Sequence, residues 1–175
     1  MTDDGVYLLT AVRLLSMSIF LPVFQWFGRS WVGMRINDSM WLFPALEAVH
    51  IVALAMLCGA ILILNLRLFG ITLPGKPIRQ LAEELAPWIL VSLLIILGSG
   101  LMLFASEAMK VYASVPFRVK MILLFAAIAF HYTIYSHMIY TDEPQVSPTW
   151  NKLAATVSLV LWFSVGLGGR AIGFL

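Results

Sequence analysis

Apolar residues in this sequence fall into four long runs separated by short polar segments. The runs cover residues 41–66, 87–105, 117–140 and 150–169, and each is long enough to cross about 30 Å of hydrocarbon at 1.5 Å per residue. The linkers between successive runs are short, so neighbouring helices must run in opposite directions. The pattern predicts an all-α integral membrane protein in which residues 38–175 form a four-helix up-down-up-down bundle.

Capping and turn residues indicate where these helices begin and end. Asp38 and Ser39 precede the first run and can accept hydrogen bonds from the free amides of a helix N-terminus. Arg67 and Gly70 close that run, as expected at a helix C-terminus. Pro87 suits the first turn of the second helix, where its missing N–H costs nothing.

The N-terminal segment, residues 1–37, has a mixed pattern. Its apolar run LLSMSIFLPVFQWFG is interrupted by Pro22 and Gln25 and is followed by Arg29 and Arg35. A helix with aromatic residues and a basic face lies more naturally in the headgroup plane than across the bilayer. We therefore expect an interfacial amphipathic helix here, with a fifth span as the alternative.

Composition strengthens the membrane assignment and excludes several classes of protein. Hydrophobic residues make up 61% of the 175 residues and charged residues 11%, against roughly 25% charged in soluble domains. The mean hydropathy is +0.94. A soluble enzyme fold is excluded by this balance, and a disulfide scaffold by the single cysteine, Cys58. The net charge of +2 comes from basic residues at span ends, which suits an anionic lipid bilayer and predicts no nucleic-acid partner.

The basic residues also predict an orientation. Seven lie on the face that holds both termini and four on the other, in the order Arg13, Arg29, Arg35, Lys110, Arg118, Lys120 and Arg170, then Arg67, Lys76, Arg79 and Lys152. Cytoplasmic loops of membrane proteins carry an excess of Lys and Arg. We expect a multi-pass protein of the bacterial inner membrane with both termini in the cytoplasm.

Ionisable residues inside the spans are the candidates for function, because each is costly in hydrocarbon. With Trp41 and Lys120 as markers of one interface, His50 and His131 lie about 13 Å and about 17 Å deep at 1.5 Å per residue. His137 would lie about 26 Å deep, close to the opposite interface. The sequence therefore predicts that His50 and His131 meet at nearly one level.

Two imidazoles at one level are what a b-type haem needs for its axial ligands. We predict one haem b per chain, with His50 and His131 as metal ligands. Glu47, one helical turn before His50, could accept its Nδ1 proton or carry protons to a quinone. Gly98 and Gly100 would let the flat ring approach the second helix. The expected partners of the haem propionates are the basic residues Arg35, Arg118, Lys120 and Arg170.

Several segments carry a resemblance to known families. The tract FPALEAVH, the NLRLFG segment at the end of the first span and the FRVK segment at the start of the third resemble a family of small bacterial membrane proteins of unknown function. The layout, with a histidine on the first span and FRVK followed by a histidine on the third, is similar to haem-binding four-helix proteins of the copper-resistance D and HemJ type. More loosely, it is similar to cytochrome b561. These resemblances imply a b-type haem, redox activity, and His50 and His131 as the matching ligand positions.

The resulting functional expectation is an electron-transfer subunit rather than a stand-alone enzyme. The chain has no sizeable soluble domain for a hydride donor or an organic substrate. It would pass electrons between a redox partner protein, or a larger membrane complex, and the quinone pool. Two alternatives stay open: a HemJ-like porphyrinogen oxidase, and a haem-free anchor or assembly subunit in which the histidines are hydrogen-bonded inside the bundle.

Overall fold

The fold is built from helices along the whole described chain. A computed structural model describes residues 21–73, 75–112, 114–140 and 148–172. Residues 21–28 are helical. The elements that follow are α2 (Trp31–Asn37), α3 (Leu42–Leu68), α4 (Ile78–Val111), α5 (Val115–Phe130), the π-helical turn η1 (His131–Tyr135), α6 (Ser136–Tyr140) and α7 (Pro148–Ile172).

Four of these helical stretches are long and apolar enough to cross a membrane. They are Leu42–Leu68, Ile78–Val111, Val115–Tyr135 and Thr149–Arg170. Their outward faces carry large apolar side chains, among them Val52 on α3, Leu94 on α4, Ile122 on α5 and Phe163 on α7, each 60–69% exposed. Such faces are stable against lipid and not against water. The predicted all-α four-helix membrane bundle is confirmed.

The second span begins and ends beyond its predicted limits. α4 starts after Pro77, and Pro87 lies inside the helix instead of in its first turn. The added N-terminal turns are polar: Lys76 is paired with Glu84, and Arg79 Nε donates to Glu83 Oε1 at 3.1 Å. Because these charged residues pair along the helix surface, the helix extends past the apolar run that marked the span in the sequence.

The ends of α3 lie where the sequence predicted them, but Asp38 caps a different helix. Ser39 Oγ accepts from the Leu42 amide at 3.3 Å, whereas Asp38 is the C-terminal cap of α2. At the other end, Gly70 adopts φ +78° directly after the cap residue Phe69. This left-handed conformation is the usual way for a helix to end at glycine.

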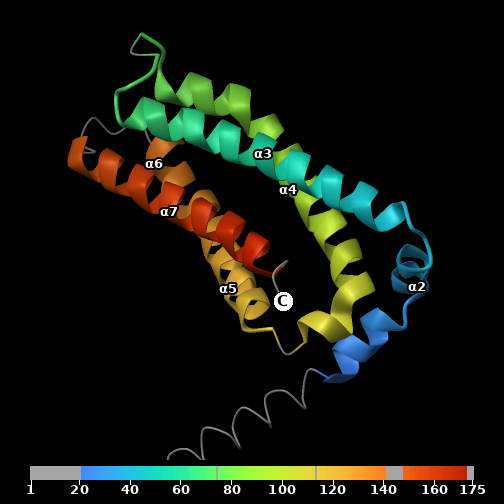
Figure 1. The fold of residues 1–175 in the computed structure, drawn as a ribbon. Coiled ribbons are helices and arrows are strands. Elements are labelled where there is room, and N and C mark those ends of the chain that lie inside the picture. The colour runs from blue at the N-terminus through green and yellow to red at the C-terminus, as the bar shows by residue number, and fades with distance from the viewer. Residues whose placement is uncertain (1–20, 74, 113, 141–147, 173–175) are drawn as a thin grey trace, which may run out of the picture.

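The four long helices form two antiparallel pairs. Figure 1 shows α3 lying along α4 and α5 lying along α7, with the two pairs joined where α7 approaches α3 and α6 approaches α4. From this joined end the pairs diverge, so the bundle is closed at one end and open at the other. The open end holds the start of α3, the last turns of α4 and the start of α5.

A hydrogen-bonded polar cluster holds the closed end together. Tyr135 Oη donates to Asn65 Oδ1 at 3.1 Å, and Asn65 Nδ2 donates to Ser158 Oγ at 3.3 Å and to Ile61 O at 2.9 Å. The side chains of Tyr135, Asn65 and Ser158 are at most 1% exposed. The cluster therefore links α3, η1 and α7 inside the bundle.

The described part of the N-terminal segment lies against the end of α4. Gly33 of α2 packs so closely that a Cβ there would stand 2.6 Å from the Ala105 carbonyl oxygen. Asn37 Nδ2 donates at 2.9 Å to the carbonyl oxygen of Ser106, the residue after Ala105. At the next residue, Glu107, α4 bends (φ −112°, ψ 18°). Residues 21–37 thus sit beside the ends of two spans. Residues 1–20, which complete the predicted interfacial helix or its alternative, a fifth span, lie outside the described residues.

A cluster of aromatic rings lies at the open end of the bundle. Phe104 of α4 stacks on Phe117 of α5 with ring centroids 5.4 Å apart. Phe24, from the N-terminal helix, packs edge-on against Phe104 and Tyr112 at 5.1 and 5.2 Å. This aromatic cluster is the contact between the two helix pairs at the open end.

Candidate functional site

The candidate site lies at the open end of the bundle and is centred on His50 of α3. His50 Nδ1 lies 2.8 Å from Ser99 Oγ on α4. The Ser99 hydroxyl donates its own proton to Ile95 O at 2.6 Å, so its lone pair accepts from Nδ1–H. In this arrangement the imidazole proton is on Nδ1 and Nε2 keeps its lone pair. A neutral imidazole held this way is ready to bind a metal ion through Nε2.

A glycine on α4 makes room for the His50 ring. A Cβ added at Gly100 would lie 3.2 Å from His50 Cε1 and 3.7 Å from Nδ1. The ring therefore packs directly on the backbone of α4. Ser99 and Gly100 together fix both the direction and the position of the imidazole.

Lys120 of α5 is the second polar residue of the site. A Cβ at Gly168 would lie 3.3 Å from Lys120 Cβ, and one at Gly169 would lie 3.3 Å from Nζ. The lysine thus extends along two glycines of α7. Its amine has no hydrogen bond or ion pair among the described residues.

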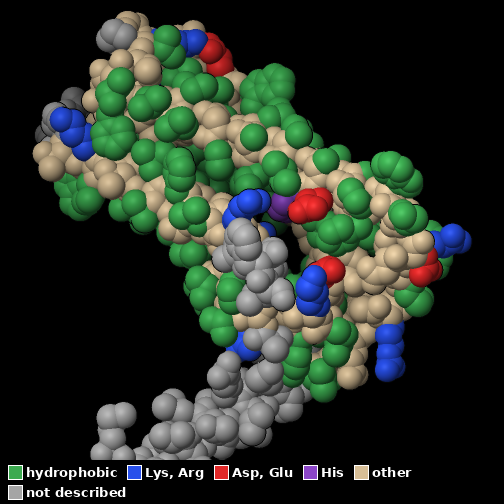
Figure 2. Space-filling model, in the orientation of Figure 1, with side chains coloured by type: hydrophobic (Ala, Val, Ile, Leu, Met, Phe, Trp, Pro, Cys, Tyr) green, Lys and Arg blue, Asp and Glu red, His purple; other side chains and the backbone are tan. Residues whose placement is uncertain are grey.

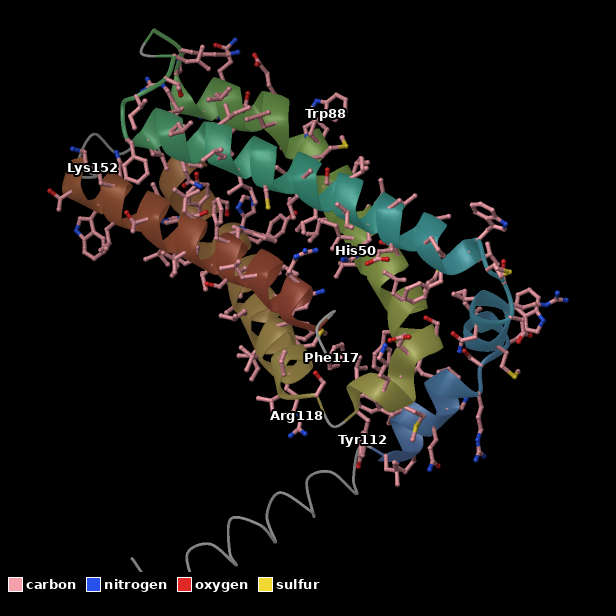
Figure 3. The ribbon with its side chains drawn as sticks, viewed as in Figure 1. His50, Trp88, Tyr112, Phe117, Arg118 and Lys152 are labelled. Carbon is pink, nitrogen blue, oxygen red and sulfur yellow. The ribbon has the colours of Figure 1, made fainter. Side chains whose placement is uncertain are left out.

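The surface is hollowed between the two helix pairs at this point. Figure 2 shows a histidine at the edge of the hollow, with a basic and an acidic side chain beside it. In the same orientation, Figure 3 labels this position as His50. Glu47, one turn before His50 on α3, is exposed. Histidine, basic and acidic side chains therefore gather at this hollow.

His131 does not join this site. Asn65 lies fifteen residues past His50, and Tyr135 lies fifteen residues past Lys120. Because α3 and α5 run in the same direction, the hydrogen bond from Tyr135 to Asn65 places those two residues at one level. Lys120 therefore lies level with His50. His131 is eleven residues further along α5, roughly 16 Å deeper at 1.5 Å per residue.

The surroundings of His131 differ from those of His50. Its ring stacks on Tyr135 with centroids 5.4 Å apart and meets Trp162 of α7 edge-on at 6.5 Å. The side chain is 8% exposed, and its Nδ1 is buried without a hydrogen-bond partner. The structure therefore separates the two histidines that the sequence analysis placed at one level.

The other predicted site residues are divided between the hollow and the outside. Gly98 has open space where a Cβ would lie, about 200° around α4 from Gly100. The Arg35 guanidinium lies 5.4 Å above the Trp31 ring on α2. Figure 3 shows Arg118 at the start of α5, directed away from His50. Arg170 is exposed in the last turn of α7, next to Gly169.

One residue of the site, Ser99, was missed in the sequence. Its hydroxyl donates to Ile95 O of its own helix, and its oxygen also lies 2.8 Å from His50 Nδ1. The signal was its neighbour Gly100, since a Ser-Gly pair on the helix antiparallel to α3 offers both a hydrogen-bond acceptor and space for the His50 ring.

No group of three or more His, Cys, Asp or Glu side chains that could hold a metal ion occurs among the described residues.

Comparison with known proteins identifies a family without adding an activity. A family model matches residues 23–175, and its description records a family of unknown function. No curated protein matches the chain. No solved structure matches it either.

Proposed function

Because the chain belongs to the family of unknown function DUF6644, we propose a function from its own residues: a membrane b-type cytochrome subunit that transfers electrons, with His50 as a haem ligand. The observation that carries the proposal is the contact of His50 Nδ1 with the Ser99 hydroxyl. Its Nδ1–H is held by Ser99 at 2.8 Å, and Nε2 is left with a free lone pair. Ligating histidines are held by this type of second hydrogen bond.

The residues of the hollow fit a haem held from one side by His50. The macrocycle would bring the apolar surface that the diverging helix pairs leave uncovered, next to the aromatic rings of Phe104 and Phe117. The Lys120 amine is level with His50 and has no hydrogen bond or ion pair with the part of the chain that the structure describes, so it can pair with a propionate or provide a second nitrogen ligand. The same residues do not fit a haem held between His50 and His131, because both axial ligands must lie at one level.

A bound haem supplies a one-electron redox centre, and the protein supplies its binding and surroundings. Ser99 orients His50, Gly100 seats its ring, and Lys120 provides positive charge. Glu47 lies within one turn of His50 on the exposed side of the hollow, where it can exchange protons with the membrane surface. These roles suit electron exchange between a partner redox protein and the quinone pool of a bacterial inner membrane.

One alternative has an observation in its favour. A haem-free anchor subunit would hold its histidines by hydrogen bonds inside the bundle, and the His50–Ser99 bond satisfies that requirement for one of them. It leaves Nε2 of His50 and the Lys120 amine without a role, whereas the cytochrome proposal uses both. The HemJ-like oxidase has no observation that favours it over electron transfer.

Reduction by a quinol tests the proposed function. The detergent-purified protein is mixed anaerobically with a short-chain quinol, and the absorption spectrum is compared with that after dithionite. We expect both reductants to produce a reduced haem α-band, the quinol on a timescale of seconds or less. A haem that dithionite reduces and quinol does not would contradict the quinone link. A protein without haem would leave the anchor alternative.

Ser99→Ala is expected to weaken haem retention without preventing insertion. The substitution removes the acceptor of the His50 Nδ1 proton, and loss of such a partner typically lowers metal affinity about 10–100-fold. Ser92→Ala is the matched control, because Ser92 is also buried on α4 but its hydroxyl has no hydrogen-bond partner. Titration of haemin into the two apoproteins measures the difference. Equal affinities would show that Ser99 does not position His50.

A further inference from the structure

The π-helical turn η1 directs two polar rings into the bundle. It covers the five residues His131–Tyr135, and its first and last residues are buried while the three between them are exposed. The wider π turn brings side chains four residues apart onto one side. Accordingly, the His131 and Tyr135 rings stack at 5.4 Å with an interplanar angle of 24°.

Only one of these two rings has its polar atom satisfied. Tyr135 Oη donates to Asn65 at 3.1 Å, whereas His131 Nδ1 is buried without a partner. Trp162, whose ring lies edge-on to His131, is in the same situation: its Nε1 is also buried without a hydrogen-bond partner among the described residues. His131 is 8% exposed and Trp162 is 3% exposed. Two contacting rings from different helices thus each present an unpaired nitrogen in the middle of a membrane bundle.

The chemistry of the two nitrogens limits what can join them. The Trp162 indole N–H is a donor only, so its partner must bring an acceptor. His131 Nδ1 is a donor or an acceptor according to its tautomer. A water molecule satisfies both nitrogens in either tautomer, and buried waters occur where such polar atoms would otherwise stay unpaired.

We propose that His131 and Trp162 bind an internal water molecule between η1 and α7, at a site separate from the hollow at His50. The water accepts the Trp162 Nε1 proton and exchanges a hydrogen bond with His131 Nδ1. It gives His131 a role in the bundle that does not depend on haem. It also continues the polar cluster of Asn65, Tyr135 and Ser158 by one further residue along η1, since His131 stacks on Tyr135.

The test is water-to-indole cross-relaxation in the full chain. Protein labelled with ¹⁵N-tryptophan in perdeuterated micelles gives indole signals from its six tryptophans, and Trp162→Phe identifies one of them by its loss. We expect a rotating-frame Overhauser peak between the Trp162 N–H and water, of the sign of direct dipolar contact. Trp88, 57% exposed on an apolar span, is the control for water that penetrates from outside.

His131→Phe separates a bound water from a water that only visits Trp162. The phenylalanine keeps the ring packing on Tyr135 and removes the second partner of the water. We expect the Trp162 water peak to fall several-fold, with the Trp88 signal unchanged. If Trp162→Phe does not fold, the comparison of His131→Phe with the wild type still tests the proposal. The Trp162 signal is then identified as the indole signal that His131→Phe shifts most. Absence of a water peak at Trp162, or a peak unaffected by His131→Phe, would overturn the proposal.

Discussion

His50→Ala is expected to abolish the Soret band of the purified protein, whereas His131→Ala is expected to keep it. His50 offers a deprotonated Nε2 at the hollow, fixed by Ser99 on the other ring nitrogen. His131 lies roughly 16 Å deeper along the bundle by helical rise, packed between Tyr135 and Trp162. Removal of an axial ligand releases or misplaces the haem, while removal of a distant ring leaves it bound. The measurement is the ratio of Soret to protein absorbance after purification in haem-sufficient cells.

His137→Ala provides the control for loss of a histidine as such. His137 is exposed on α6, beyond the π-helical turn. We expect it to retain the wild-type Soret band, and all three variants to insert in the membrane at similar levels. Equal loss of haem in His50→Ala and His131→Ala would contradict the arrangement described here and restore the bis-histidine pair.

Asn65→Leu is expected to lower the free energy of unfolding by roughly 1–3 kcal/mol, because it leaves buried polar partners unpaired. Tyr135 Oη would lose its acceptor and Ser158 Oγ its donor, and both side chains are at most 1% exposed. Leucine fills a similar volume, so the effect reports the hydrogen bonds more than a cavity. The measurement is unfolding by sodium dodecyl sulfate in mixed micelles.

Two further variants make the Asn65 result specific. Asn151→Leu changes the same residue type at a partly exposed position on α7 and should shift stability by no more than about 0.5 kcal/mol. Tyr135→Phe removes one interhelical bond of the cluster and should cost about 0.6 kcal/mol, the average for such bonds in membranes, and no more than about 1.7 kcal/mol. An Asn65→Leu protein as stable as wild type would show that the cluster does not hold the closed end together.

The helices could be predicted from the sequence because hydrocarbon requires long apolar runs. Residues 41–66 predicted α3 to within two residues of its observed ends, Leu42–Leu68. The start of α4 could not be found the same way, since its first turns are stabilised by ion pairs such as Arg79 with Glu83 and not by apolar character. The π-helical turn at His131 has no sequence signal of its own.

The depth of each polar residue was the part that sequence reasoning could not fix. Lys120 was taken as an interfacial anchor, a common role for lysine at a span end. In the structure its side chain extends along Gly168 and Gly169 into the bundle, so it marks the level of His50 instead of the interface. This shift in one marker separated His131 from His50. The tertiary hydrogen bond from Tyr135 to Asn65 sets that register.

The most direct test of the central claim is the haem content of the purified chain. A pyridine haemochrome assay on protein made with ample haem measures haem b per polypeptide, and a reduced-minus-oxidised spectrum of the same sample shows whether that haem is redox-active. We expect one haem b per chain, lost in His50→Ala. A wild-type protein that folds, inserts and contains no haem would contradict it.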